Sequence, residues 1–380
     1  MNKILLSTLL CGLVLTIGML NPTYAFTKTL VSSPNPNFAT FCKWTTGSLL
    51  YKSSNLTATD TTDWNLVIPN WNDVPSGATL SKFSGSTNIV YYSVNNPNVS
   101  WDGLTSYTCN GSGNFVSPVN IYINDHFTNG YGREERQSVI AHETGHSLGL
   151  AHTTGATLMN GFTCGTGSRW CTYSIFVPVL DDINGVQNLY GSTSTTAAKT
   201  CVVSTADTPS CTYGGSNGYP IQLKVSSAAT GAYAFTYPGG SAVSLPSSNT
   251  LMMLGQVTPN TLYRYSMGIY TATNPYNTSN RFMTIEVDNT GFNLVGSSST
   301  SIGSTTPSTG TTYVLELVAE NGLPAAGYVF TSSGTYIGTA TLSPSLGWST
   351  SVYYGHGVWT DTSSNPASNY SVNAWYNYLF

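Results

Sequence analysis

The sequence contains few charged residues and no concentration of positive charge. Charged side chains make up 7% of its 380 residues, and the formal net charge is −4, whereas roughly a quarter of the residues in typical soluble domains are charged. Because nucleic acids and anionic membrane surfaces attract clustered lysine and arginine, this composition argues against either as the main partner. The length exceeds one ordinary hydrophobic core and predicts two or three domains.

Long hydrophobic runs are absent beyond the N-terminus. The one such run covers residues 4–20, follows the single charge of Lys3, and precedes small residues at Thr23 and Ala25. This pattern predicts a signal peptide over residues 1–25, cleaved after Ala25, and therefore a secreted, extracellular protein that does not span the membrane. The alternative is an uncleaved anchor, because the run is near the lower length limit for a membrane span.

Cysteine is also sparse, with seven residues, one of which lies inside the expected signal peptide. The other six allow many pairings. Two pairs are close in sequence, and the remaining two residues would close a long loop: Cys164 with Cys171, Cys201 with Cys211, and Cys42 with Cys109. Such disulfides predict an oxidising compartment.

The first half of the chain alternates predicted strands and helices. The hydrophobic periodicity predicts strands at residues 43–52, 88–94 and 119–123, and helices at residues 57–74, 130–150 and 181–190. Pro69 should kink or shorten the first helix. Residues 96–115 are rich in glycine, asparagine and serine and predict a loop.

The second half lacks helical periodicity. Residues 192–199 have the composition of a linker, and short alternating runs follow, as at residues 221–225 and 313–318. Such runs are typical of an all-β sandwich. A second Ser/Thr/Gly-rich break favours two modules, residues 200–300 and 310–380, with one domain over residues 200–380 as the alternative.

Three of the five histidines lie in one short segment that begins at His142. His142 and His146 are four residues apart on a predicted helix, so both imidazoles face the same side. Glu143 lies beside them, Gly149 permits a turn out of the helix, and His152 follows as a third ligand. Three protein ligands leave one coordination position open, as in catalytic zinc sites. The alternative is a buried helix with hydrogen-bonded core histidines.

This segment resembles the zinc-binding signature of the metzincin endopeptidases, and Met159 resembles the methionine of their Met-turn. Thr153, directly after the third histidine, and the run that begins at Asp181 are similar to the matrixin subfamily. The resemblance covers roughly residues 42–191. It implies an α+β metzincin-like catalytic domain over residues 26–191, with a twisted mixed sheet and two to three helices.

The resemblance also implies a role for each residue of the motif. The three histidines would bind one catalytic Zn²⁺, and Glu143 would activate a zinc-bound water for hydrolysis of a peptide bond. Residues 160–180 would line the pocket for the residue after the scissile bond, with an apolar preference. Cys42 could instead be a free thiol that blocks the zinc. Structural support would come from four residues: Met159, Gly149, Asp181 and Asp182.

Two functions follow from these observations. The favoured one is a secreted, monomeric zinc endopeptidase that cleaves proteins or peptides and whose β-modules contact cell wall or polysaccharide; calcium binding is left open. The alternative is a surface adhesin or binding protein with a relic metal domain, suggested by the tyrosine-rich, charge-poor second half. Because all three histidines and Glu143 are retained, the sequence favours the peptidase.

Overall fold

We describe the protein from a computed structural model. The structure describes residues 27–28, 42–74, 76–192, 199–203, 210–213, 221–225, 232–238, 243–244, 250–259, 264–296, 298–320, 324–342, 351–359 and 370–379. The expected signal peptide and most of the expected linker lie outside these residues. Within them, no helix is both long enough and apolar enough to cross a membrane.

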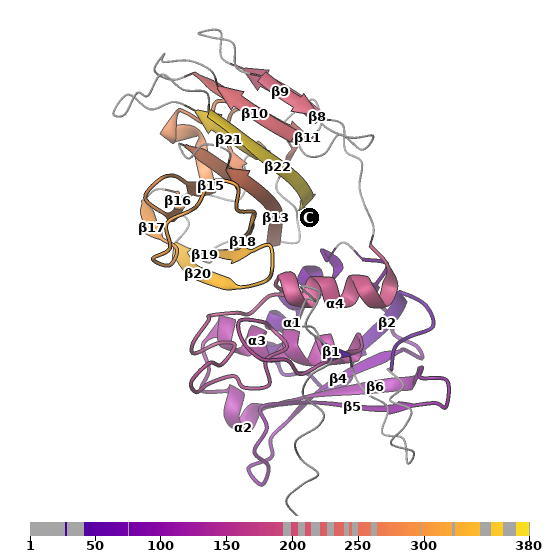
Figure 1. Ribbon diagram of the computed structural model, residues 1–380. Coiled ribbons are helices and arrows are strands. Elements are labelled where there is room, and N and C mark those ends of the chain that lie inside the picture. The colour runs from indigo at the N-terminus through magenta and orange to yellow at the C-terminus, as the bar shows by residue number, and fades with distance from the viewer. Residues whose placement is uncertain are drawn as a thin grey trace, which may run out of the picture.

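The N-terminal half contains a five-stranded mixed sheet with the order β3-β2-β4-β6-β5 (Figure 1). Strand β2 pairs in parallel with β3 and β4, β4 pairs in parallel with β6, and β5 runs antiparallel along β6 at the edge. The alternation predicted at residues 119–123 is confirmed, since Val119, Ile121 and Ile123 are all buried. The strands are β2 (Ser48–Ser53), β3 (Thr79–Lys82), β4 (Ile89–Val94), β5 (Gly103–Cys109) and β6 (Phe115–Asn124).

Strand β5 corrects one expectation from the sequence. It lies within residues 96–115, which we predicted to be a loop. An edge strand pairs on one side only and here has mostly exposed or half-exposed side chains, so it does not require a hydrophobic alternation. Its composition therefore did not distinguish it from a loop.

Four helices accompany this sheet, where two to three were expected. The additional one is the short α2, and α1 continues past Pro69 instead of ending there. Helices α1 and α3 pack against each other, and the Trp71 indole nitrogen on α1 donates to the Ala141 carbonyl on α3 over 3.0 Å. The helices are α1 (Ala58–Asn72), α2 (Asp125–Thr128), α3 (Arg133–Ser147) and α4 (Leu180–Tyr190).

The C-terminal end of α3 is held by side chains from distant parts of the chain. The Trp44 indole nitrogen donates to the Ser147 carbonyl, and the Tyr190 hydroxyl donates to the Leu148 carbonyl, each over 2.8 Å. Gly149 follows with a φ of +101°, a conformation that favours glycine. The chain then turns into β7 (Leu150–Ala151), which pairs with β1 (Thr27–Lys28).

The cysteine pairing expected from the sequence is confirmed. The structure contains three disulfides: Cys42–Cys109, Cys164–Cys171 and Cys201–Cys211. The first of these joins the chain ahead of β2 to the end of β5. The alternative that Cys42 carries a free, zinc-blocking thiol is therefore wrong, because its sulfur is bonded to Cys109.

The C-terminal half is a sandwich of two antiparallel sheets (Figure 1). One has the order β20-β19-β18-β13-β22-β10-β9, and the other has the order β17-β16-β15-β14-β21-β11-β8, with β12 also paired to β21. The strands are β8 (Lys199–Val203), β9 (Ser210–Tyr213), β10 (Ile221–Val225), β11 (Tyr233–Pro238), β12 (Val243–Ser244), β13 (Thr250–Pro259), β14 (Tyr265–Tyr270), β15 (Arg281–Val287), β16 (Phe292–Val295), β17 (Ser299–Ser301), β18 (Tyr313–Glu320), β19 (Ala325–Thr331), β20 (Tyr336–Leu342), β21 (Ser351–Trp359) and β22 (Tyr370–Leu379).

Strands from before and after residues 300–310 alternate within both sheets. Strand β22 lies between β13 and β10, and β21 lies between β14 and β11. A boundary at residues 300–310 would break the backbone hydrogen bonds of both sheets. The division into modules 200–300 and 310–380 therefore fails, and the break in composition is a connection within one sandwich.

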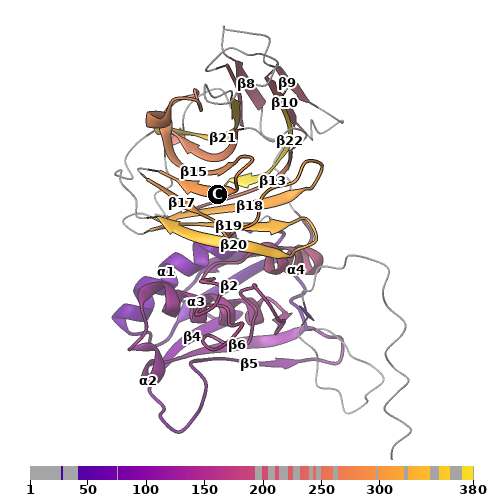
Figure 2. The same ribbon diagram turned by 60° about the vertical axis from the view of Figure 1, so that its left-hand side comes forward.

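The sandwich packs against the N-terminal half through the face that β13, β18 and β19 present to α1 and α4 (Figure 2). Val314 and Val318 of β18 belong to the same buried hydrophobic cluster as Trp71 and Met159. The Tyr328 hydroxyl of β19 donates to the Ser174 carbonyl over 3.0 Å. The two halves thus share one hydrophobic core at their contact.

Candidate metal centre

Helix α3 and the segment after β7 bring three imidazoles together. The Nε2 atom of His142 lies 3.1 Å from the Nε2 atoms of both His146 and His152. Tetrahedral zinc with Zn–N bonds of about 2.0–2.1 Å separates its nitrogen ligands by about 3.3 Å. The spacing of the three ring nitrogens is therefore close to what one such ion requires.

The opposite ring nitrogens fix the orientation of two of these imidazoles. The Nδ1 atoms of His142 and His146 lie 2.7 Å from the carbonyl oxygens of Leu158 and Leu150. Because a carbonyl oxygen only accepts, each Nδ1 carries the hydrogen and each Nε2 presents a lone pair to the centre.

The imidazoles are also held in their neutral form. Burial lowers the pKa of His142 well below its usual range, lowers that of His146 to about 4, and lowers that of His152, with the nearby Arg169 charge acting in the same direction. Neutral imidazoles whose lone pairs converge would repel one another without a cation between them. The chemistry of the three donors therefore fits a divalent metal such as zinc.

Glu143 is held beside the imidazoles by the edge strand β5. It is 5% exposed, and the Thr105 hydroxyl lies 2.7 Å from its Oε2 and 2.8 Å from its backbone oxygen. Burial raises the pKa of Glu143 to about 7, against the lowering effect of the Thr105 hydrogen bond. A β-carbon at Gly103 would lie 2.7 Å from Glu143 Cγ, so this close approach requires glycine.

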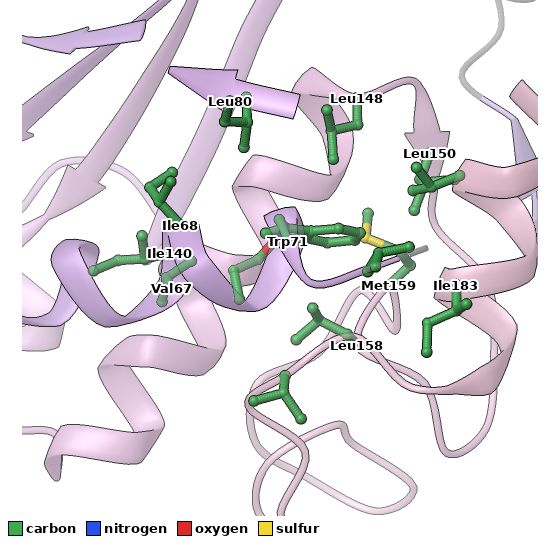
Figure 3. Packing of buried hydrophobic residues seen from close by; sticks show 14 of the residues in the cluster. Val67, Ile68, Trp71, Leu80, Ile140, Leu148, Leu150, Leu158, Met159 and Ile183 are labelled. Atoms are coloured by element: carbon green, nitrogen blue, oxygen red, sulfur yellow. The ribbon is translucent and has the colours of Figure 1, made fainter. Parts of the chain in front are cut away.

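Met159 lies beside Trp71, Leu158 and Ile183 (Figure 3), and the carbonyl oxygen of the preceding Leu158 lies 2.7 Å from His142 Nδ1. Met159 is buried, and a β-carbon at Gly145 would lie only 2.4 Å from its sulfur. A glycine in the last turn of α3 is therefore needed for the helix to approach this methionine. The sequence placed Met159 here by resemblance but did not identify Gly145 as its counterpart.

Asp182 of α4 binds the turn that carries Met159. Its carboxylate accepts hydrogen bonds over 2.7–3.1 Å from the Thr157 hydroxyl and from the backbone nitrogens of Leu158, Met159 and Val179. The neighbouring Asp181 instead lines a separate cavity of about 360 Å³ at the contact between the two halves. The two acidic residues, which the sequence grouped together, thus lie in different environments.

A cavity of about 820 Å³ opens over the three histidines. Its walls come from the start of β5, from α3, and from the loop that contains Gly161 and Phe162. This volume is within the range of small-molecule and peptide side-chain sites. The cavity also contains Arg169, a residue that sequence reasoning missed because its loop has no periodic pattern.

Comparison with known proteins supports part of this description. Residues 108–191 match a family model described as Matrixin. The search of curated proteins gives no match. This family match includes all three histidines, Glu143 and Met159, and it supports a matrixin-like zinc peptidase domain in that part of the chain.

Solved structures share similarity with about half of the chain. A protein of unknown function from Shewanella oneidensis MR-1 is 12% identical, with a TM-score of 0.34 over 46% of this chain and 76% of that one. The Lotus tetragonolobus seed lectin is 8% identical, with a TM-score of 0.33 over 49% and 96%. Arcelin-5, a lectin-like defense protein from Phaseolus vulgaris, is 8% identical, with a TM-score of 0.32 over 48% and 99%. These scores are too low to support a conclusion about function.

Proposed function

We propose that this protein is a secreted zinc-dependent endopeptidase. One observation carries the proposal: three neutral imidazoles converge in an open cavity, and a buried carboxyl group, Glu143, lies beside them. Three protein ligands with access from solvent are typical of a catalytic metal rather than a structural one. The three disulfides support export to an oxidising compartment.

The histidines and Glu143 would have different roles in the reaction. His142, His146 and His152 would hold the ion, which, when bound, polarises the peptide carbonyl and lowers the pKa of water. The Glu143 carboxylate would accept a proton from the attacking water and transfer it to the departing amine nitrogen. The hydrogen bond from Thr105 and the close approach of Gly103 hold Glu143 in position for both transfers.

The edge strand β5 offers a surface for an extended peptide. Gly103, Leu104 and Thr105 line the cavity, and β6 is the one strand that pairs with β5 among the residues that the structure describes. A peptide backbone could therefore add to the open side of β5 by main-chain hydrogen bonds, as peptides do at other exposed sheet edges. This placement would bring its carbonyl groups past Glu143.

Replacement of Glu143 with alanine tests the proposal. We expect Glu143→Ala to abolish cleavage of casein while zinc content stays near one ion per chain, because the three imidazoles are untouched. Glu134→Ala, on the first turn of the same helix, is the matched control and should retain activity. Proteolysis by Glu143→Ala at the wild-type rate would refute the assignment of this site as the catalytic centre of an endopeptidase. A wild-type protein that binds zinc but cleaves nothing would favour the binding-protein alternative.

A further inference from the structure

Arg169 places a permanent positive charge in the wall of the cavity. Its side chain lines the same space as His142 and Glu143, yet the residue is only 1% exposed. A buried charge is unfavourable unless hydrogen bonds and opposite charges compensate it. Burial lowers the pKa of Arg169, whereas the charges of Asp102 and Glu143 raise it. None of the proposed proton transfers passes through this guanidinium.

Three hydrogen bonds fix the guanidinium in one orientation. Its Nε donates to the Ser138 hydroxyl over 3.1 Å, its Nη1 to the Asn160 carbonyl over 3.0 Å, and its Nη2 to the Thr163 hydroxyl over 2.5 Å. These bonds join α3 to the loop that follows Met159. All three acceptors are neutral, and they use three of the five N–H groups that an arginine carries.

Asp102, whose charge acts on Arg169, is already hydrogen-bonded to two hydroxyl groups. The Asp102 carboxylate accepts from the Thr163 hydroxyl over 2.5 Å and from the Tyr131 hydroxyl over 3.4 Å. Thr163 therefore lies between Asp102 and Arg169, and none of the ion pairs within the described residues includes Arg169. The guanidinium keeps N–H groups for an acceptor that enters the cavity.

We propose that Arg169 is a specificity-determining residue, which selects a side chain ending in a hydrogen-bond acceptor, glutamate or glutamine, for the residue after the scissile bond. This inference rests on the proposed peptidase function. It differs from the apolar preference that the family resemblance implies. A leucine in the pocket would cover the guanidinium without pairing it, whereas a carboxylate or amide oxygen would complete its hydrogen bonds.

The geometry also predicts the size of the discrimination. A pocket built to hydrogen-bond its substrate rejects an analogue without the polar group far more strongly than an apolar pocket rejects a change of one methylene. The donor is rigid, buried and charged, so little ordering is needed when the substrate binds. We expect kcat/KM for glutamate or glutamine to exceed that for leucine by at least about ten-fold.

The test uses three quenched fluorescent peptides that differ only after the scissile bond, with glutamate, glutamine or leucine. Wild type should cleave the first two preferentially. Arg169→Met should invert this order, and Arg169→Lys should keep part of the preference for glutamate alone, because a lysine supplies charge without the planar fork. Arg133→Met is the matched control, since Arg133 is partly exposed and pairs with Asp63 outside the cavity; it should leave the order unchanged.

A binding measurement separates specificity from turnover. The dissociation constants of the three peptides for the Glu143→Gln protein, from fluorescence anisotropy, should follow the same order as kcat/KM. If Arg169→Met does not fold, the new N-termini that wild type produces from a denatured protein mixture give the preference directly. Enrichment of leucine at those termini, or equal cleavage of all three peptides, would overturn the role of Arg169 and leave the peptidase intact. No cleavage of any substrate would instead refute the proposed function itself.

Discussion

Two buried carboxyl groups near the contact between the halves have opposite environments. Asp182 of α4 accepts four hydrogen bonds, whereas neither oxygen of Glu316 on β18 has a hydrogen-bond partner within the described residues. Both residues are almost completely buried. The two residues are thus equally buried, but Asp182 on the N-terminal side of the contact is fully hydrogen-bonded, whereas Glu316 on the sandwich side has no hydrogen bond within the described residues.

The face on which Glu316 lies explains its burial. Its neighbours Leu315 and Leu317 point into the core of the sandwich, whereas Val314 and Val318 belong to the cluster shared with the N-terminal half. Glu316 alternates with these valines and so lies on their face. Burial raises the pKa of Glu316 well above its usual range, and the Asp182 charge raises it further.

The difference assigns distinct roles to the two acids. Burial also raises the pKa of Asp182, but its four donors oppose this rise and favour the charged form. A carboxylate with such donors anchors backbone, while a carboxyl group without them is tolerated only as the neutral acid. We therefore expect Asp182 to stabilise the turn that carries Met159, and Glu316 to be buried as the neutral acid.

The largest expected effect comes from removing the four hydrogen bonds that the Asp182 carboxylate accepts. We expect Asp182→Ala to lower the free energy of unfolding of the N-terminal half by about 3–5 kcal/mol, because it leaves several buried donors without an acceptor. The turn that carries Leu158 would loosen, and zinc affinity should fall with it, since the Leu158 carbonyl orients His142. Thermal unfolding and zinc content of the full chain measure both effects.

Asp181→Ala is the control for this prediction. Asp181 lines the cavity between the halves rather than the Met-turn, so the melting temperature and zinc content should change little. Equal losses of melting temperature and zinc content in the two variants would contradict the prediction, because they would show that Asp181 and Asp182 contribute equally despite the hydrogen bonds of Asp182.

The second largest effect should come from replacing Glu316, the buried acid without hydrogen-bond partners within the described residues. Its folded pKa is raised, so the protonated form stabilises the folded state below the unfolded value near 4.5, and this contribution is lost as pH rises toward the folded pKa. The loss amounts to roughly 1.4 kcal/mol per pH unit. We expect Glu316→Leu to remove this slope and to raise the melting temperature at pH 7 more than at pH 4.

Glu316→Gln sharpens the same test. It removes the titration but keeps a buried polar group without partners, so it should flatten the pH dependence without the gain in stability that leucine brings. If wild type and both variants show the same dependence of melting temperature on pH, Glu316 is not the group that couples the contact to protons.

Glu316 also shows how far the sequence could be interpreted. The alternation at residues 313–318 predicted a strand, and the structure confirms it as part of β18. Alternation normally places a glutamate toward solvent. It could not reveal that the polar face of this strand is covered by another part of the chain, because burial between two halves depends on their relative placement and not on the local pattern.

In the candidate metal centre, too, the sequence predicted some residues and missed others. The three histidines and Glu143 were identified because their spacing on one helix and its following turn brings them together through local geometry. Gly103, Thr105 and Arg169 were missed, since they approach from an edge strand and an irregular loop. Their positions depend on sheet register and loop packing, for which a single sequence holds no periodic signal.

The smallest expected effect concerns the hydrogen bond between the halves. Tyr328→Phe removes the bond from the Tyr328 hydroxyl to the Ser174 carbonyl, and we expect a loss of about 0.5–1.5 kcal/mol. Tyr313→Phe is the matched control, because the Tyr313 hydroxyl accepts from the Ser308 nitrogen within the sandwich. Differential scanning calorimetry should show that Tyr328→Phe separates the unfolding of the two halves, whereas Tyr313→Phe destabilises the sandwich alone. A separation larger than that caused by ionisation of Glu316 would mean that this hydrogen bond, and not the proton on Glu316, dominates the contact.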